Sequence, residues 1–270
     1  MKITRYRNTD GSIGYAGATD EHEFFALDGD LFGSFELTGN PVEIEKQLAP
    51  VDPRIVLAIG LNYRQHAEES GLPVPKFPVL FVKPGGAVQN PRDPIVLPAC
   101  TKRDEVDYEC ELAVVIGKPC RDATPENALD HVLGYTCAND VSARDWQLNK
   151  SGGQWCRGKS FDTFAPLGPC LVTTDEIPDP NNLRIRTVLN GETVQDSNTR
   201  DMIFSVPELI TSLSAGMTLQ PGTVIMTGTP QGVGMARKPP VWLKDGDSVT
   251  VIIENIGALT NPVVEEPGRS

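Results

Sequence analysis

Residues 106–116 read Val-Asp-Tyr-Glu-Cys-Glu-Leu-Ala-Val-Val-Ile. The apolar run at its end, residues 112–116, predicts a β-strand that continues into the protein interior. Side chains alternate between the two faces of a strand, so we expect Asp107, Glu109 and Glu111 on one face, with Glu109 and Glu111 roughly 7 Å apart. Two charges at that separation repel by about 0.6 kcal/mol in water and by about 2.4 kcal/mol at an effective dielectric constant of about 20. A bound cation or a proton would remove this repulsion; the alternative is an edge strand whose acidic face is solvated.

Strand signals dominate the rest of the chain. Further apolar runs predict strands over 55–60, 79–82, 133–138, 183–189, 224–227 and 249–253. Helical patterns are fewer, over 62–70, 125–132 and 205–214, and the last begins with a capping-box pair, Ser205 and Glu208. An Asn190-Gly191 pair predicts a tight hairpin turn. The sequence therefore predicts an α+β fold that is mostly β, without the βαβ alternation of a doubly wound sheet.

Two parts can be distinguished along the chain. In residues 1–50, short β-like runs alternate with the turn pairs Asp10-Gly11 and Asp28-Gly29, which predicts a small N-terminal β domain. The segment 49–53, Ala-Pro-Val-Asp-Pro, resembles a linker. Residues 51–270 are expected to form one larger, catalytic domain.

Composition excludes several classes of function. The chain has 24 Lys and Arg against 36 Asp and Glu, a formal net charge of −12. Such a balance argues against a nucleic-acid surface and against binding to an anionic membrane. We find no apolar run of about 18 residues and no signal-peptide pattern. The six cysteines lack the close spacing of a zinc site, so we expect free thiols and a cytoplasmic location.

A second acidic position follows an apolar strand. Residues 134–147 read Gly-Tyr-Thr-Cys-Ala-Asn-Asp-Val-Ser-Ala-Arg-Asp-Trp-Gln. Asp140 is at the predicted strand end, and Arg144 and Gln147 would share a side of the chain if it turns helical. Glu109, Glu111 and Asp140 together would form an all-oxygen site, which favours Mg²⁺, Mn²⁺ or Ca²⁺ over Zn²⁺. The alternative role of Asp140 is that of a helix N-cap.

A histidine and a carboxylate are paired in the predicted helix over 62–70. His66 and Glu69 stand at i and i+3, which are neighbours on a helix face. A carboxylate beside an imidazole fixes its tautomer and makes it a better base. The alternative is an incidental pair on a solvated helix.

Two loop-like motifs complete the inventory. Residues 153–160, Gly-Gln-Trp-Cys-Arg-Gly-Lys-Ser, match the phosphate-binding pattern GxxxxGK[ST]. Neither a buried strand before it nor a helix after it is predicted, since Pro166, Gly168 and Pro169 follow; we therefore reject a nucleotide site and keep Lys159 as a candidate site lysine or a surface residue. Residues 227–234, Thr-Gly-Thr-Pro-Gln-Gly-Val-Gly, predict a tight loop, closing over a small ligand or merely connecting two elements.

In this order, the motifs resemble the fumarylacetoacetate hydrolase family, from about residue 55 to residue 264. The segments that carry the resemblance are Leu61-Asn62-Tyr63 with His66, Phe81-Val82-Lys83-Pro84, Asp107-Tyr108-Glu109-Cys110-Glu111-Leu112, Asn139-Asp140-Val141-Ser142-Ala143-Arg144-Asp145, Gly158-Lys159-Ser160-Phe161-Asp162, Pro166-Leu167-Gly168-Pro169, Leu189-Asn190-Gly191-Glu192 and the loop 227–234. Family members called domain-containing protein 2 are similar at Trp146-Gln147 and at Arg237-Lys238-Pro239-Pro240-Val241.

The resemblance implies a mixed β-roll and a homodimer. It implies Mg²⁺ or Mn²⁺ held by Glu109, Glu111 and Asp140. It also implies His66 and Glu69 on a segment that closes over the substrate, with Lys159, Arg144, Gln147 and Thr229 around the ligand. The founding hydrolase has a further carboxylate ligand shortly before its catalytic histidine, where this chain reads Ala58-Ile59-Gly60-Leu61. We therefore expect more open metal positions here and leave the substrate undecided within the 2-oxo acids.

These parts predict a metal-dependent enzyme acting on a small 2-oxo acid, with the metal as Lewis acid. If His66 activates water, an acylpyruvate-type substrate, such as fumarylacetoacetate, is hydrolysed at a C–C bond, which is the activity we expect first. If His66 only moves a proton, the reaction is a keto–enol tautomerisation, with oxaloacetate a candidate. Decarboxylation, hydration and dienoate isomerisation are further alternatives.

Overall fold

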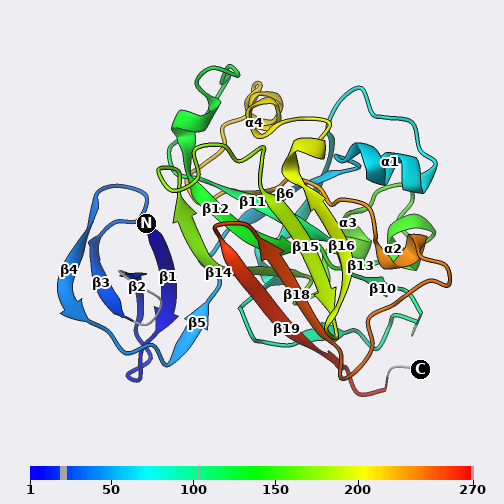
Figure 1. Cartoon of the computed structure of the whole chain (residues 1–270), viewed down its shortest axis with the longest axis horizontal. Helices are drawn as coiled ribbons and strands as arrows, with labels where there is room; N and C mark the ends of the chain where they lie inside the picture. The colour runs from blue at the N-terminus through cyan, green and yellow to red at the C-terminus, as the bar shows by residue number, and fades with distance from the viewer. Residues whose placement is uncertain (19–22, 103, 269–270) are drawn as a thin grey trace.

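Short strands in three sheets make up most of the regular structure of the chain (Figure 1). The computed structural model describes residues 1–18, 23–102 and 104–268. Parallel pairs such as β17 with β6 occur beside antiparallel ones such as β11 with β12. The prediction of an α+β fold that is mostly β, with mixed sheets, is confirmed.

The largest sheet runs through the N-terminal part of the chain and the body. Its main path has the order β4-β3-β2-β1-β14-β12-β11-β17-β6-β7, with β5 paired to β1 and β8 to β14. Its strands are β1 Lys2–Arg7, β2 Ile13–Ala18, β3 Phe24–Gly29, β4 Phe35–Pro41, β5 Lys46–Leu48, β6 Ile55–Gly60, β7 Val79–Pro84, β8 Val88–Gln89, β11 Cys110–Ile116, β12 Val132–Asn139, β14 Ala165–Thr173 and β17 Val224–Met226.

The second sheet has the order β16-β15-β18-β19-β9, and β10 and β13 form a two-stranded ribbon. These strands are β9 Ile95–Leu97, β10 Val106–Asp107, β13 Ser142–Ala143, β15 Arg184–Leu189, β16 Glu192–Asn198, β18 Ser248–Ile253 and β19 Gly257–Glu265. The helices are α1 Arg64–Ser70, α2 Arg144–Leu148, α3 Cys156–Lys159 and α4 Val206–Ser214, with 3₁₀ turns at Gly85–Ala87, Ala128–His131, Thr199–Asp201 and Gly234–Ala236.

Strand β11 is buried on both faces, which explains its continuous apolar sequence. Leu112, Val114 and Ile116 pack with residues of the second sheet and of α4. Ala113 and Val115 pack on the other side, in a cluster that also contains Ile3 of β1. Core side chains therefore pack against both faces of β11, the strand that contains Glu111.

The first strands form a separate lobe at the left of Figure 1, and β1 joins this lobe to the body. Lys2 and Ile3 pair with Val172 and Leu171 of β14. The linker-like segment is packed rather than exposed, since Ala49 and Val51 are buried in the same cluster as Ile3. The boundary between residues 50 and 51 stays a prediction.

Several predicted elements need correction. The single strand expected over 106–116 is divided into β10 and β11, because the Tyr108 N–H donates to the side chain of Asp107 and the Glu109 N–H to the side chain of Asn139 instead of to a backbone ladder. The helix expected over 125–132 is only the 3₁₀ turn Ala128–His131, and Asp28 and Gly29 belong to β3 rather than to a turn. The capping box of α4 is confirmed, as is the turn at Asn190 and Gly191, whose φ values of 51° and 86° suit a tight hairpin.

Candidate functional site: a buried carboxylate cluster beside a histidine

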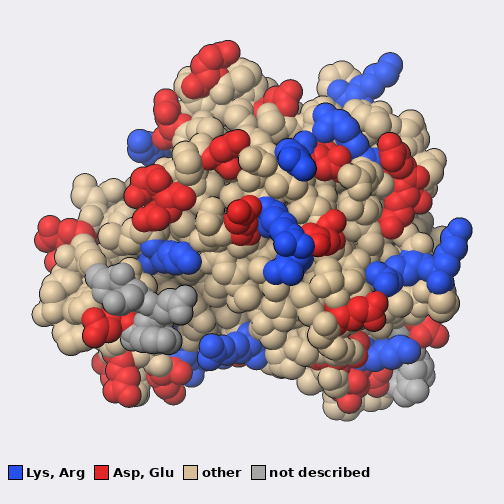
Figure 2. Space-filling model, viewed as in Figure 1, with Lys and Arg blue, Asp and Glu red and all other residues tan. Residues whose placement is uncertain are grey.

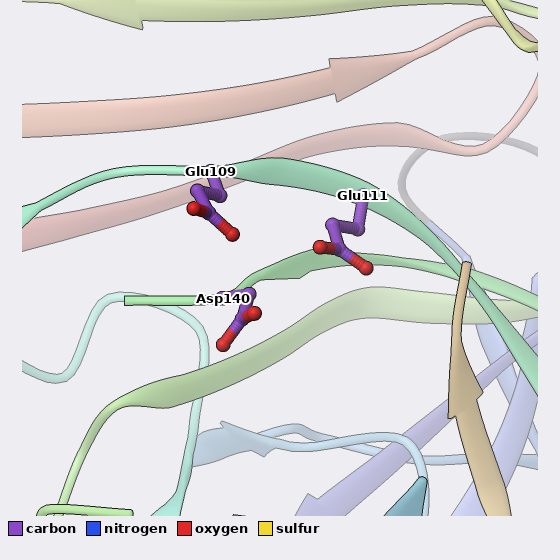
Figure 3. Close-up of side chains that lie close together, drawn as sticks. All are labelled: Glu109, Glu111 and Asp140. Carbon is purple, nitrogen blue, oxygen red and sulfur yellow. The ribbon is translucent and has the colours of Figure 1, made fainter. Parts of the chain in front are cut away.

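The three acids predicted as metal ligands lie together (Figure 3). Each offers a carboxylate oxygen within 4.8 Å of the others, and all three side chains are buried. Glu111 lies in β11, Glu109 just before it, and Asp140 directly after β12, the antiparallel neighbour of β11. The Asp140 N–H donates to the Glu109 carbonyl over 2.9 Å, so backbone pairing itself brings the carboxylates to one place. Asp140 is not a helix N-cap, because α2 begins only at Arg144.

Three cations face these carboxylates. Lys159 Nζ donates to Glu109 Oε2 over 2.8 Å and to Asp140 Oδ2 over 2.7 Å. Lys83 Nζ donates to Asp140 Oδ1 and to the Val141 carbonyl. Arg144 Nη1 lies 2.7 Å from Glu109 Oε1. Lys159 is therefore a buried site residue, and the alternative of a surface lysine is wrong.

The two glutamates have opposite pKa shifts. Burial opposes ionisation of Glu109, but Lys159 and Arg144 outweigh it and lower its pKa to about 2. Burial raises the pKa of Glu111 well above its usual value, and the charges of Asp140 and Glu109 raise it further. Glu111 accepts a hydrogen bond from the Gly228 N–H over 2.7 Å, which offsets only part of this. Paired carboxyl groups with divergent pKa values are typical of functional sites.

The donor set fits a hard divalent cation. Three carboxylate groups converge, and oxygen-only ligands suit Mg²⁺ or Mn²⁺, and also Ca²⁺. Burial, together with the charges of Asp140 and Glu109, disfavours the ionised form of Glu111. A divalent cation held by Glu109, Glu111 and Asp140 would favour that ionised form.

The predicted base faces the same space. A cavity of about 450 Å³ is lined by His66 and Glu69 from α1 and by Glu109, Glu111 and Lys159 from the cluster. His66 Nδ1 lies 3.2 Å from Glu69 Oε2, so this pair forms as predicted. Glu69 in turn accepts from the Gly232 N–H at 3.0 Å and 3.1 Å, which fixes the carboxylate from the loop 227–234.

Gly60, the last residue of β6, packs closely against Trp155. A Cβ at Gly60 would lie 2.0 Å from the Trp155 ring, so the absence of a side chain is needed for packing. The start of α1 is tied to the body, since Arg64 Nη1 donates to the Asp201 and Met202 carbonyls and Gln65 N–H to the Asp201 carboxylate.

The residues predicted around the ligand also line the cavity. Most of the N–H groups of the Arg144 guanidinium interact with other residues of the protein, namely Asp107, Glu109 and Gln147. Gln147 accepts from Arg144 through Oε1 over 3.0 Å, and its NH₂ group is left to donate elsewhere. Thr229 accepts from Gln195 over 2.9 Å. Their roles toward a substrate remain predictions.

Sequence reasoning did not assign three residues of this site. Lys83 had no signal beyond a lysine inside an apolar strand. Asp107, expected beside Glu109 and Glu111 on one strand face, instead accepts from Arg144 and from the Gly234 and Met235 N–H groups. Gln195 lies in a hairpin strand whose alternation gave no sign of burial. Each of these three residues has its place in the site because of a hydrogen-bond partner far away in the sequence.

Two further observations concern the surface charge and the length of the helices. Lys and Arg side chains are interspersed with Asp and Glu on the face shown in Figure 2. Of the helices in the described ranges, none has the length and apolar character needed to cross a membrane.

Comparison with known proteins identifies the family. The family model "Fumarylacetoacetate (FAA) hydrolase C-terminal" matches residues 55–264. The chain is 53% identical, over 80% of its length and 68% of the relative's, to the oxaloacetate tautomerase fahd2, mitochondrial, of Xenopus laevis. Among solved structures, it is similar to 5-carboxymethyl-2-hydroxymuconate delta-isomerase from Mycobacterium smegmatis, with 40% identity, coverage of 98% and 100% of the two chains and a TM-score of 0.85. It is also similar to a fumarylacetoacetate hydrolase from Exiguobacterium antarcticum, with 38% identity, coverage of 98% and 99% and a TM-score of 0.79. With a family match over most of the chain, a shared fold and enzymes as relatives, this protein belongs to the fumarylacetoacetate hydrolase family of enzymes.

Proposed function

We propose that this enzyme moves a proton within a small 2-oxo acid, a keto–enol tautomerisation with oxaloacetate as the candidate substrate, and that it uses Mg²⁺ or Mn²⁺. The observation that supports this most directly is the His66–Glu69 pair in the wall of the cavity that also contains the carboxylate cluster. The name of the Xenopus laevis relative supports the same reaction.

The protein groups have separate tasks in this reaction. Glu69 accepts from His66 Nδ1–H and so leaves Nε2 as the unprotonated nitrogen. Nε2 takes a proton from the carbon next to the 2-oxo group and returns it to the oxygen, so that one C–H bond is exchanged for one O–H bond. A bound divalent cation supplies Lewis-acid stabilisation of the negative charge that develops on the substrate oxygens. Lys159 and Arg144 hold Glu109 ionised, as its low pKa indicates.

Hydrolysis of an acylpyruvate-type C–C bond is the second candidate. It is supported by the solved hydrolase from Exiguobacterium antarcticum and by the partial exposure of His66 and Glu69, 12% and 24% of their side chains, which admits water to the base. The same base would then deprotonate water instead of carbon.

A paired assay separates the two reactions. Purified protein with Mg²⁺ is mixed with oxaloacetate, and the decay of the enol absorbance is followed; a parallel sample contains acetylpyruvate, and its cleavage products are followed by NMR. We expect fast enol decay that EDTA abolishes. Glu111→Ala should lose this activity and Lys118→Ala, a substitution of an exposed lysine, should keep it. Cleavage of acetylpyruvate without oxaloacetate tautomerisation would favour hydrolysis, and full activity in excess EDTA would refute metal dependence.

We also propose a cytoplasmic homodimer. Strand β7 is at the edge of the large sheet, and the exposed side chains of Leu80 and Val82 on it follow the exposed Val74 and Phe77. Among the described strands, β7 pairs only with β6, and an apolar sheet edge of this kind is a natural place for a second copy. Sedimentation of wild type and of Phe77→Ser tests the dimer, and cell fractionation tests the location.

A further inference from the structure

Gln195 is a buried glutamine directly behind the carboxylate strand. It lies in β16, and its side chain is 2% exposed. Its Oε1 accepts from the Cys110 N–H over 3.0 Å and from the Thr187 hydroxyl over 2.7 Å. Its Nε2 donates to the Thr229 hydroxyl and to the Pro230 carbonyl, each over 2.9 Å.

The orientation of this amide is fixed by two backbone groups. A backbone N–H can only donate and a carbonyl can only accept, so Oε1 must face Cys110 and Nε2 must face Pro230. The alternative, flipped amide would set two donors against each other at Cys110 and two acceptors against each other at Pro230. The direction of the hydrogen bond between Gln195 and Thr229 is therefore determined as well.

This direction decides what Thr229 can offer to a ligand. Its oxygen already accepts from Gln195, so its hydroxyl proton is free to donate, and no residue in the described ranges accepts it. Thr229 lines the cavity beside His66 and the carboxylates. Gln147, which also lines the cavity, is a second such donor. Its Oε1 accepts from Arg144, and its NH₂ group has no acceptor among the described residues.

We infer that Gln195 is a positioning residue that turns Thr229 into a hydrogen-bond donor, so that this wall of the cavity selects ligands with an acceptor oxygen, such as a carboxylate. Gln195 touches no substrate itself and acts through Thr229. The inference rests on the proposed function only in taking a 2-oxo acid as the ligand.

A double-mutant cycle tests this role. The variants are Gln195→Met, Thr229→Val and the double variant, with Gln47→Met as the matched control, since Gln47 donates to the Pro169 carbonyl far from the site. Loss of one hydrogen bond corresponds to roughly a threefold to tenfold change. We expect each single variant to raise KM for oxaloacetate, and Kd for oxalate in calorimetry, by that factor, with kcat and Mg²⁺ affinity changing less than twofold. The double variant should be no worse than Thr229→Val.

The outcomes are distinguishable. Effects that multiply in the double variant, or a Mg²⁺ affinity that falls together with substrate affinity, would show that Gln195 only supports the carboxylate strand and would overturn the inference. If Gln195→Met does not fold, Gln195→Glu replaces it. One carboxylate oxygen still accepts from Cys110, and the other, despite a repulsive contact with the Pro230 carbonyl, accepts the hydroxyl proton of Thr229 and so withdraws it from the ligand. Unchanged oxalate binding by this variant would also overturn the inference. Oxalate binding that responds as expected, without oxaloacetate turnover, refutes the proposed tautomerase activity alone, whereas a wild type that binds no oxalate refutes both.

Discussion

Replacing Lys159 by methionine should destabilise the metal-free protein severely while increasing its response to Mg²⁺. Lys159 Nζ lies 2.8 Å from Glu109 Oε2 and 2.7 Å from Asp140 Oδ2, and the side chain is 2% exposed. Methionine keeps most of the length of the side chain and removes the charged ammonium group with its hydrogen-bond donors. Glu109 and Asp140 then lose the partner that they share.

The size of the effect follows from this geometry. Removing one partner of a buried ion pair costs about 3–5 kcal/mol, a large part of the roughly 5–15 kcal/mol by which proteins are usually stable. At about 2–4 °C per kcal/mol, the melting temperature in EDTA should fall by roughly 10 °C. Mg²⁺ should bind more tightly to a cluster that has lost a competing positive charge, so its stabilising effect should be larger in the variant than in wild type.

Thermal unfolding followed by circular dichroism, in EDTA and in Mg²⁺, measures both quantities. Lys150→Met is the matched control, because Lys150 also pairs with a carboxylate, that of Asp145 at 3.1 Å, but is 43% exposed. An exposed pair contributes at most about 1 kcal/mol, so this control should melt within about 3 °C of wild type. A Lys159→Met protein that melts like the control in EDTA, or that gains no more from Mg²⁺ than wild type, would refute the electrostatic account of the site.

Four further predictions concern the site and the sheet. The raised pKa of Glu111 means that ionisation of this side chain destabilises the folded state. The metal-free protein should therefore lose stability as the pH rises above about 4.5, the pKa of a free glutamate. Glu111→Gln should reduce this pH dependence in thermal melts. Between the pKa of a free glutamate and the raised pKa of Glu111, Mg²⁺ binding should release a proton from Glu111, detectable by calorimetry in buffers of different ionisation enthalpy. His66→Ala should lower kcat about 10²–10⁴-fold without changing Mg²⁺ affinity, and Glu69→Gln should cost less, because it removes orientation and leaves the base; equal losses would contradict this. A chain without residues 1–50 should still bind Mg²⁺, since every proposed ligand lies beyond them, but should melt at a lower temperature because Ile3 leaves the core; loss of Mg²⁺ binding would contradict the predicted boundary.

Local patterns were sufficient to predict the strand face with Glu109 and Glu111 and the pairing of His66 with Glu69. Glu109 and Glu111 stand two apart on one strand face, Asp140 ends the next strand, and His66 and Glu69 are neighbours on one helix. For the two glutamates and for His66 with Glu69, the feature depends on spacing within a few residues, which the periodicity of strands and helices converts into geometry. Asp140 joins the glutamates only through the pairing of β11 with β12. The β-rich class followed from the same periodicity.

Long-range partners could not be predicted in this way. Lys83 bonds Asp140, 57 positions later, and Asp107 bonds Arg144, 37 positions later. Neither residue differs, in its local sequence, from an ordinary charged position in or near a strand. The same limit explains the break between β10 and β11, which depends on the side chain of Asn139 taking the place of a backbone partner for Glu109.

The junction between β1 and β14 has a consequence for how the chain folds as it is made. Lys2 and Ile3 leave the ribosome well before their partners Val172 and Leu171, which lie about 170 positions later in the sequence. Until then β1 can pair with β2 and with β5, but part of its edge has no partner and can bind a strand of another nascent chain. Pairing over such a sequence separation is intrinsically slow. Productive folding of this protein therefore requires that this edge of β1 stays free of other strands until residues 165–173 are available to pair with it.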